Sequence, residues 1–193
     1  MLRFDFAGSP KMTTRVHAEL QEILPMDSVE LAHLEDAIAW VNSGAPLFRI
    51  AKPATPPKHL VSYFAVVDQE HILLVHHKNA KLWLPTGGHV EPNEDPRATV
   101  SREAKEELGL EISLTEVGPP KMVTVTETVG VTSGHIDVSL WYVLQGDRNS
   151  KRVFDQFDQS EFNDVRWFPF AQAPLHRSDP HLGRFLAKLR SGV

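Results

Sequence analysis

Two stretches near the start of the chain carry apolar residues at every third or fourth position, the period of an α-helix. They cover residues 12–24 and residues 28–41. Asp27 precedes the second stretch, where its carboxylate can accept hydrogen bonds from the free N–H groups of a first turn, and Gly44 follows its end. The pattern therefore predicts two helices, which form an N-terminal helical extension.

The pattern changes from about residue 59 to short runs of β-branched and other apolar residues. Residues 61–67 and 71–77 are two such runs, and the three polar residues between them predict a hairpin. A last helical pattern covers residues 180–189. Further strands are predicted over residues 82–85, 111–117, 121–129, 135–145 and 164–168.

A proline-rich connector, KPATPPK at residues 52–58, separates the two parts. Proline neither continues a helix nor joins a central strand, so we predict an extension and connector over residues 1–57 and a main domain over residues 58–193. Two helices are too few to bury a core alone. The extension should therefore pack on the main domain, where it could cover a pocket, or on a second copy of the chain in a homodimer.

Strands that enclose helices predict an α/β fold with a mixed sheet. The helix between the two groups of strands has both of its ends marked. Asp95 can cap its start, Pro96 suits the first helical position, and Gly109 suits a left-handed cap at its end. An apolar or small residue recurs at every fourth position between them, which predicts that one face of this helix is buried.

An adjoining face of this helix carries three carboxylates within about one turn, those of Glu103, Glu106 and Glu107. Like charges at this spacing repel, so the run is either a solvated helix face or a site for a divalent cation. Arg102 can reach Glu106 and orient the cluster. The preceding loop, residues 85–88, has two glycines whose carbonyls can approach an ion closely, and together these features favour the cation site.

The stretch 88–110, GHVEPNEDPRATVSREAKEELGL, resembles the Nudix box, G-x5-E-x7-R-E-U-x-E-E-x-G-U, in which U is a bulky aliphatic residue. Seven specified residues at background frequencies of roughly 6% give a chance match on the order of 10⁻⁹ per window. Ala104 is small for the first aliphatic position, which alters packing but removes no ligand. The matched fixed positions are Gly88, Glu94, Arg102, Glu103, Glu106, Glu107 and Gly109.

This resemblance implies a Nudix-like α/β/α sandwich that hydrolyses a pyrophosphate bond in a nucleoside diphosphate linked to another group. It implies Mg²⁺ (or Mn²⁺) as cofactor, with Glu103, Glu106, Glu107 and the carbonyl of Gly87 or Gly88 as ligands, because hard oxygen donors suit these ions. The catalytic candidates in the box are Glu103 and Glu106, with Arg102 orienting the carboxylates. The substrate would be a nucleotide-like small molecule. A non-catalytic nucleotide-binding or regulatory module on the same fold is the alternative.

The general base that would activate water stays open between several carboxylates. Members of the resembling family often use a carboxylate outside the box, and Glu161, six residues before Trp167, is the first catalytic candidate of this kind. Asp137 and Glu127 are alternatives, and for each of the three an ordinary surface or hydrogen-bonded carboxylate is the competing interpretation. Glu94 could bind backbone amides or a metal-bound water, and the structural role is favoured.

His135 and Asp137 stand two residues apart on one predicted strand and therefore share a face. They could bind a metal ion, but no third imidazole is spaced along the chain to help, so a hydrogen-bonded or substrate-facing histidine is favoured. Four aromatic residues could stack on a nucleobase, although core packing is favoured for each. They are Phe64, Trp83, Trp141 and Tyr142.

Composition and charge narrow the class of protein further. The chain is 41% apolar and 23% charged, as in ordinary globular proteins, and its net charge of −5 argues against a nucleic-acid partner. It has no cysteine, which excludes disulfides and a thiol nucleophile and fits a cytoplasmic location. The first residues lack a long apolar run, so neither a signal peptide nor a membrane span is expected.

Overall fold

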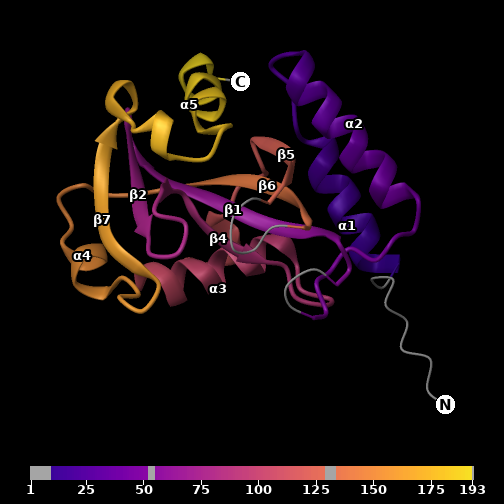
Figure 1. Ribbon diagram of the computed structural model, residues 1–193, viewed down its shortest axis with the longest axis horizontal. Helices are drawn as coiled ribbons and strands as arrows, with labels where there is room; N and C mark the ends of the chain where they lie inside the picture. The colour runs from indigo at the N-terminus through magenta and orange to yellow at the C-terminus, as the bar shows by residue number, and fades with distance from the viewer. Residues whose placement is uncertain (1–9, 52–54, 129–133, 193) are drawn as a thin grey trace.

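In the computed structural model, which describes residues 10–51, 55–128 and 134–192, seven strands form one mixed β-sheet (Figure 1). The strands are β1 (Lys58–Asp68), β2 (His71–His77), β3 (Trp83–Leu84), β4 (Thr86–His89), β5 (Met122–Glu127), β6 (Ile136–Gln145) and β7 (Phe162–Pro169). The main order is β3-β2-β1-β6-β5, with β1 and β6 parallel at the centre. All other pairs, including β4 with β1 and β7 with β2, are antiparallel.

The two faces of the sheet have separate apolar cores, because side chains alternate along a strand. Leu73 belongs to one core, and its neighbours Ile72 and Leu74 belong to the other. Helix α3 (Pro96–Leu108) packs on the first face and helix α5 (Leu182–Ser191) on the second (Figure 1). The predicted α/β/α sandwich with a mixed sheet is therefore confirmed.

The N-terminal helices α1 (Pro10–Gln21) and α2 (Ser28–Asn42) pack on the sheet domain of the same chain. Trp40 is buried in the first core, together with strand residues. Helix α2 also contacts the edge strand β5, where the backbone N–H of Val125 donates to Nδ1 of His33 at 3.0 Å. The extension thus covers one edge of the sheet (Figure 1), and the homodimer stays a prediction.

The predicted strand over residues 111–117 is wrong. Ser113 instead begins a short 3-10 helix, Leu114–Glu116, and the carboxylate of Glu116 accepts from both the backbone N–H (2.9 Å) and the hydroxyl (2.6 Å) of Ser113. Such local side-chain bonds compete with strand pairing. Helix α4 (Arg152–Gln156) was not predicted, because five residues are too few to show a helical period.

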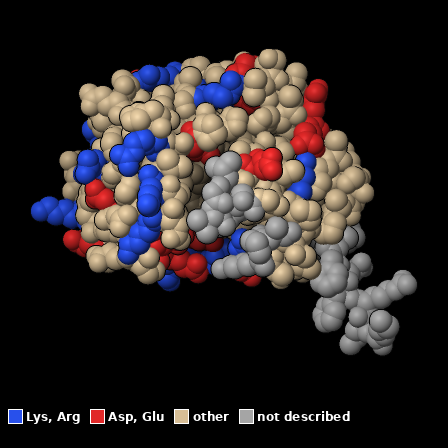
Figure 2. All heavy atoms as spheres, viewed as in Figure 1, with Lys and Arg blue, Asp and Glu red and all other residues tan. Residues whose placement is uncertain are grey.

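Some predicted segments extend beyond the described residues. Residue 129 of the predicted strand 121–129 lies outside them, as do residues 1–9 of the extension and residues 52–54 of the connector. Across the described ranges, no helix has the length and apolar character needed to cross a bilayer. On the face drawn in Figure 2, both basic and acidic side chains reach the surface, so this face does not carry a single sign of charge.

Candidate functional site

Helix α3 is held at both ends as its sequence predicts. The carboxylate of Asp95 accepts from the backbone N–H of Arg97 at 2.9 Å, and Gly109 closes the helix with φ 66°, in the left-handed region that glycine adopts easily. Val100 and Ala104 are fully buried under the helix. Because these residues fix the rotation of α3, the carboxylates of Glu103 and Glu107 face strand β4.

Two of the three clustered carboxylates of α3 lie directly against the glycines of β4. A Cβ atom built on Gly88 would fall 1.9 Å from Oε1 of Glu103, so only glycine leaves room for this carboxylate. Oε2 of Glu107 accepts from the backbone N–H of Gly87 at 3.0 Å. Gly87 also has φ 147°, which a side chain would strain. The pairing of β4 with β1 holds both glycines in place.

Arg102 joins three carboxylates at the surface of α3. Its guanidinium donates to both oxygens of Glu94, at 2.9 and 3.0 Å, to Glu103 at 2.6 Å and to Glu106 at 3.3 Å. These bonds, the one to Glu94 first, raise the pKa of Arg102, which stays charged. The side chain therefore orients the cluster, as an arginine with a rigid fork of donors can.

Glu94 has a set of protein partners that fits the structural role favoured from the sequence. Besides Arg102, it accepts from the hydroxyl of Thr99 at 2.7 Å and from the backbone N–H of Glu91 at 3.0 Å. Burial tends to raise the pKa of Glu94, but these hydrogen bonds outweigh burial and lower it. The carboxylate is thus ionised and engaged in fixing Arg102.

The box glutamates crowd negative charge into a partly buried space. Burial, followed by the charges of Glu103 and Glu161, raises the pKa of Glu107 well above its usual range. Burial also raises the pKa of Glu103, against the opposing charge of Arg102. Every candidate donor is a hard oxygen atom, including those of Glu106, whose side chain is 59% exposed. This donor set fits a divalent cation such as Mg²⁺.

Of the three carboxylates considered outside the box, Glu161 is the one whose charge acts on both Glu103 and Glu107. It precedes β7, and its Oε1 lies 3.3 Å from Nε2 of His77. Glu127 is exposed at the end of β5, and Asp137 lies within a separate group of histidines. The structure therefore brings Glu161 to the box and leaves the two alternatives elsewhere.

That group contains three histidines, and the expectation that no third imidazole supports His135 and Asp137 is wrong. His59 comes from β1 and His89 from β4, and their Nε2 atoms lie 3.2 Å and 3.8 Å from Oδ1 of Asp137. Nε2 of His135 lies 3.4 Å from the same oxygen. Burial, then the charge of Arg49, lowers the pKa of His89 to about 3, so its ring is neutral. Spacing along the chain missed this group because strand pairing assembles it.

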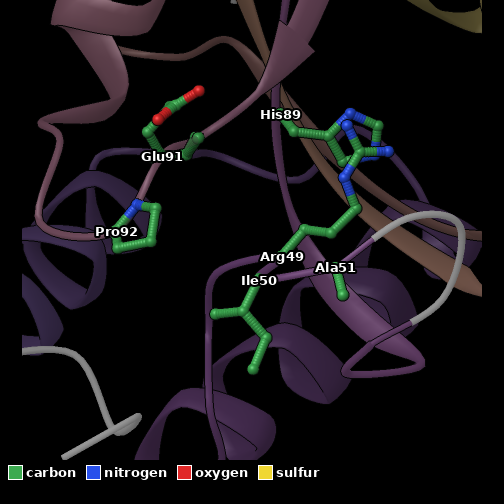
Figure 3. A pocket seen from close by; sticks show the side chains of 7 residues that line it. Arg49, Ile50, Ala51, His89, Glu91 and Pro92 are labelled. Carbon is green, nitrogen blue, oxygen red and sulfur yellow. The ribbon is translucent and has the colours of Figure 1, made fainter. Parts of the chain in front are cut away.

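A hollow of about 390 Å³ opens beside His89 (Figure 3). Arg49 and Glu91 also line it, and the close-up shows the Arg49 side chain reaching toward the His89 ring. The lining includes residues 89–92 of the box but none of the carboxylates of α3, so the hollow lies beside the start of the box and not at that cluster.

Three of the four aromatic residues considered for stacking on a nucleobase lie in the core, and the fourth is only partly buried. Phe64, Trp141 and Tyr142 are fully buried, which confirms the packing interpretation for these three. Trp83 on β3 is only partly buried and packs between Phe168, at 5.0 Å between ring centroids, and the guanidinium of Arg166, 5.2 Å from the ring. Of the four, Trp83 is the one that is not fully buried.

Comparison with known proteins agrees with this architecture. The model of the NUDIX domain family matches residues 58–189. Among solved structures, the E. coli ORF135 protein is 23% identical, with a TM-score of 0.54 over 71% of this chain and 91% of that one. A MutT NUDIX hydrolase from Burkholderia pseudomallei is 21% identical, with a TM-score of 0.53 over 68% of this chain and 97% of that one.

A third similar structure is the E. coli dihydroneopterin triphosphate pyrophosphohydrolase, at 15% identity and a TM-score of 0.50 over 73% of this chain and 97% of that one. At these identities the likeness shows the fold alone. A search of curated protein sequences finds no match.

Proposed function

Because the chain belongs to the NUDIX family, we propose that it hydrolyses, with a divalent metal ion, a pyrophosphate bond in a nucleoside diphosphate linked to another group. The observation that carries this proposal is the contact of Glu103 with Gly88, beside Glu107 on Gly87. It brings carboxylates from α3 and backbone from β4 to one place. A solvated acidic helix face would need no such fit.

Glu103, Glu106 and Glu107, with the carbonyl of Gly87, would hold Mg²⁺ or Mn²⁺. When bound, such an ion neutralises phosphate oxygens, polarises phosphorus and lowers the pKa of water. The chain itself is acidic, with a net charge of −5, so it needs positive charge to accept a pyrophosphate group. Arg102 is already engaged with three carboxylates, which supports a positioning role for it and not direct substrate binding.

Glu161 is our proposed general base. Its charge acts on Glu103 and Glu107, which supports a position beside the reacting group. Its carboxylate would accept the proton of the attacking water at one oxygen, while Nε2 of His77, 3.3 Å from Oε1, orients it. The partly buried ring of Trp83 is the candidate to stack on the base of the substrate.

A non-catalytic nucleotide-binding module on the same fold is the second candidate. Such a module has no need for the complete set of carboxylates, yet this chain keeps every fixed box residue and the contacts among them. The intact cluster supports turnover over binding alone.

The test is a substrate screen of the full chain with Mg²⁺ or Mn²⁺. The panel comprises ADP-ribose, a dinucleoside polyphosphate, an oxidised nucleoside triphosphate and a sugar nucleotide, followed by phosphorus NMR. We expect at least one compound to give two phosphorus-containing products with metal and none with excess EDTA. Saturable binding of a nucleotide without products from any compound would favour the non-catalytic module.

A further inference from the structure

Four side-chain atoms, none of them from helix α3, converge on one point; their residues lie on β1, β4 and β6 and directly before β6. They are Nε2 of His59, His89 and His135 and Oδ1 of Asp137, and the ligand atoms available from these four residues all lie within 4.8 Å of one another. The carboxylate oxygen is 3.2, 3.8 and 3.4 Å from the three nitrogens in that order. In a tetrahedral site with bonds of about 2.1 Å, ligand atoms stand about 3.4 Å apart, so the carboxylate oxygen already has nearly that spacing from each nitrogen.

Three of these atoms are buried polar atoms without a hydrogen bond. Within the described part of the chain, neither Nε2 of His59, Nε2 of His89 nor Oδ1 of Asp137 has a partner in acceptable hydrogen-bond geometry. His59 is fully buried. Buried polar atoms are rarely left unpaired, and an ion is one of the partners that explains them. All three point into the same space.

In His59 and His135, the outer ring nitrogen has a partner that favours the tautomer that metal binding needs. Nδ1 of His59 lies 2.8 Å from the carbonyl oxygen of Pro56, which can only accept, so this nitrogen carries the proton and Nε2 keeps its lone pair. The hydroxyl of Thr128 donates to the carbonyl of His135 at 3.1 Å and accepts from Nδ1 of that residue at 3.2 Å. A histidine that binds metal characteristically donates from its other nitrogen to such a partner.

Three of these residues stand on paired strands, and His135 directly precedes β6, where its carbonyl accepts from the backbone N–H of Thr128 at 2.9 Å. His59 on β1 stands opposite Asp137 on β6, and His89 on β4 pairs with Val61, two residues along β1. Sites built on paired strands hold their geometry better than sites on loops, so little rearrangement would be needed on binding.

We propose that His59, His89, His135 and Asp137 form a second metal site that binds Zn²⁺ and is separate from the carboxylates of α3. Three imidazoles and one carboxylate suit zinc, whereas Mg²⁺ prefers oxygen donors alone. All four tetrahedral positions come from the protein, as in structural zinc sites that have no open position for water. His89 directly follows Gly88, so the bound ion would fix the strand against which Glu103 packs.

The proposal is tested by measuring zinc in the chelator-treated full chain after addition of Zn²⁺ and gel filtration. We expect one zinc per wild-type chain, retained in excess Mg²⁺. Asp137→Asn and His59→Gln should each bind zinc at least about 100-fold more weakly, since losing even an outer-shell partner costs about 10–100-fold. His176→Gln, at an exposed histidine outside the group, is the matched control and should bind like the wild type.

Two further readouts make the result decisive. Co²⁺ should give the intense visible absorption of a four-coordinate site in the wild type and lose it in Asp137→Asn. Asp137 is partly exposed, so this variant decides the question if His59→Gln does not fold. A Glu106→Gln/Glu107→Gln variant should keep its zinc even though it lacks hydrolysis, which separates this site from the proposed active site. No zinc in the wild type, or zinc lost in the glutamate variant and kept in Asp137→Asn, overturns the proposal.

Discussion

The carboxylate of Glu103 fills the space that a side chain on Gly88 would need. The contact joins helix α3 to strand β4 without any covalent or ionic link between the two residues. It places one candidate ligand against the backbone that carries another, the carbonyl of Gly87. The position of the box carboxylates thus depends on the absence of a single methyl group.

Replacing Gly88 with alanine should therefore displace Glu103 while leaving the chain folded. The backbone of Gly88 is not in the left-handed region, so alanine meets no strain other than the carboxylate. A shift of about 1 Å at a catalytic group can cost about 100-fold in rate, and we expect a loss in kcat of at least that size. Gly118→Ala is the matched control, because a Cβ there would meet nothing within 4 Å. Equal activity in both variants would contradict the role of this contact.

Replacing Glu161 with glutamine should lower kcat with little change in KM, because a general base acts chiefly in the transition state. General-base catalysis contributes typically about 10²–10⁴-fold, which sets the expected loss. Steady-state kinetics of the purified variant measure it. Glu127→Gln, at an exposed carboxylate on the same sheet, should keep wild-type kinetics. If Glu161→Gln is as active as Glu127→Gln, Glu161 is not the general base.

Asp179 should make the chain less stable as the pH rises. Burial raises the pKa of this carboxyl from 3.8 to about 6, so the folded state holds its proton more tightly than the unfolded state does. Stability then falls as the pH rises between these two values, by about 3 kcal/mol in all at about 1.4 kcal/mol per pH unit.

An Asp179→Asn variant removes that titration and can still accept the hydrogen bond from the N–H of His181. We expect urea unfolding to show it more stable than the wild type by about 2–3 kcal/mol at pH 8 and by less than about 1 kcal/mol at pH 4. A constant difference at both values would contradict this assignment.

The buried ion pair between Lys188 and Glu30 should fasten the N-terminal extension to α5. Both side chains are almost fully buried, at 1% and 2% exposure, and Lys188 also donates to the carbonyl of Leu24 at 2.7 Å. Lys188→Met leaves a buried carboxylate unpaired, which costs about 3–5 kcal/mol of unfolding free energy. The exposed pair of Arg190 and Glu70 offers the control, since Arg190→Met should cost less than about 1 kcal/mol. Similarly small losses of unfolding free energy in both variants would show that this ion pair does not hold the extension on α5.

Those parts of the fold that depend on local chemistry can be predicted from the sequence. Asp95, Pro96 and Gly109 mark the ends of α3, and the alternation of apolar residues marks the main strands, because each signal acts within a few residues. The prediction of a strand over residues 111–117 was wrong because another local signal acts there. A Ser113–Glu116 capping interaction, equally local, outweighed the apolar pattern there.

Contacts between distant segments could not be predicted in the same way. His59 and His89 meet Asp137 only because β4 and β6 pair with opposite edges of β1. The spacing of these residues along the sequence gives no sign of that pairing. The proximity of Glu161 to the box likewise follows from the path of the chain between α4 and β7. Its position before Trp167 was signalled only by resemblance to a family pattern.

The proposed active site is tested most sharply by the kcat/KM of Glu107→Gln with Mg²⁺, on a substrate that the screen identifies. Glutamine preserves the shape of Glu107 and can accept from the N–H of Gly87. It also removes a buried carboxyl group whose pKa is raised, so the melting temperature of the variant should equal or exceed that of the wild type. Because a metal ion contributes several kcal/mol to catalysis, we predict a loss of at least about 100-fold. Glu111→Gln, at an exposed carboxylate paired with Lys105, should keep full activity. Full activity in Glu107→Gln would contradict the proposed site.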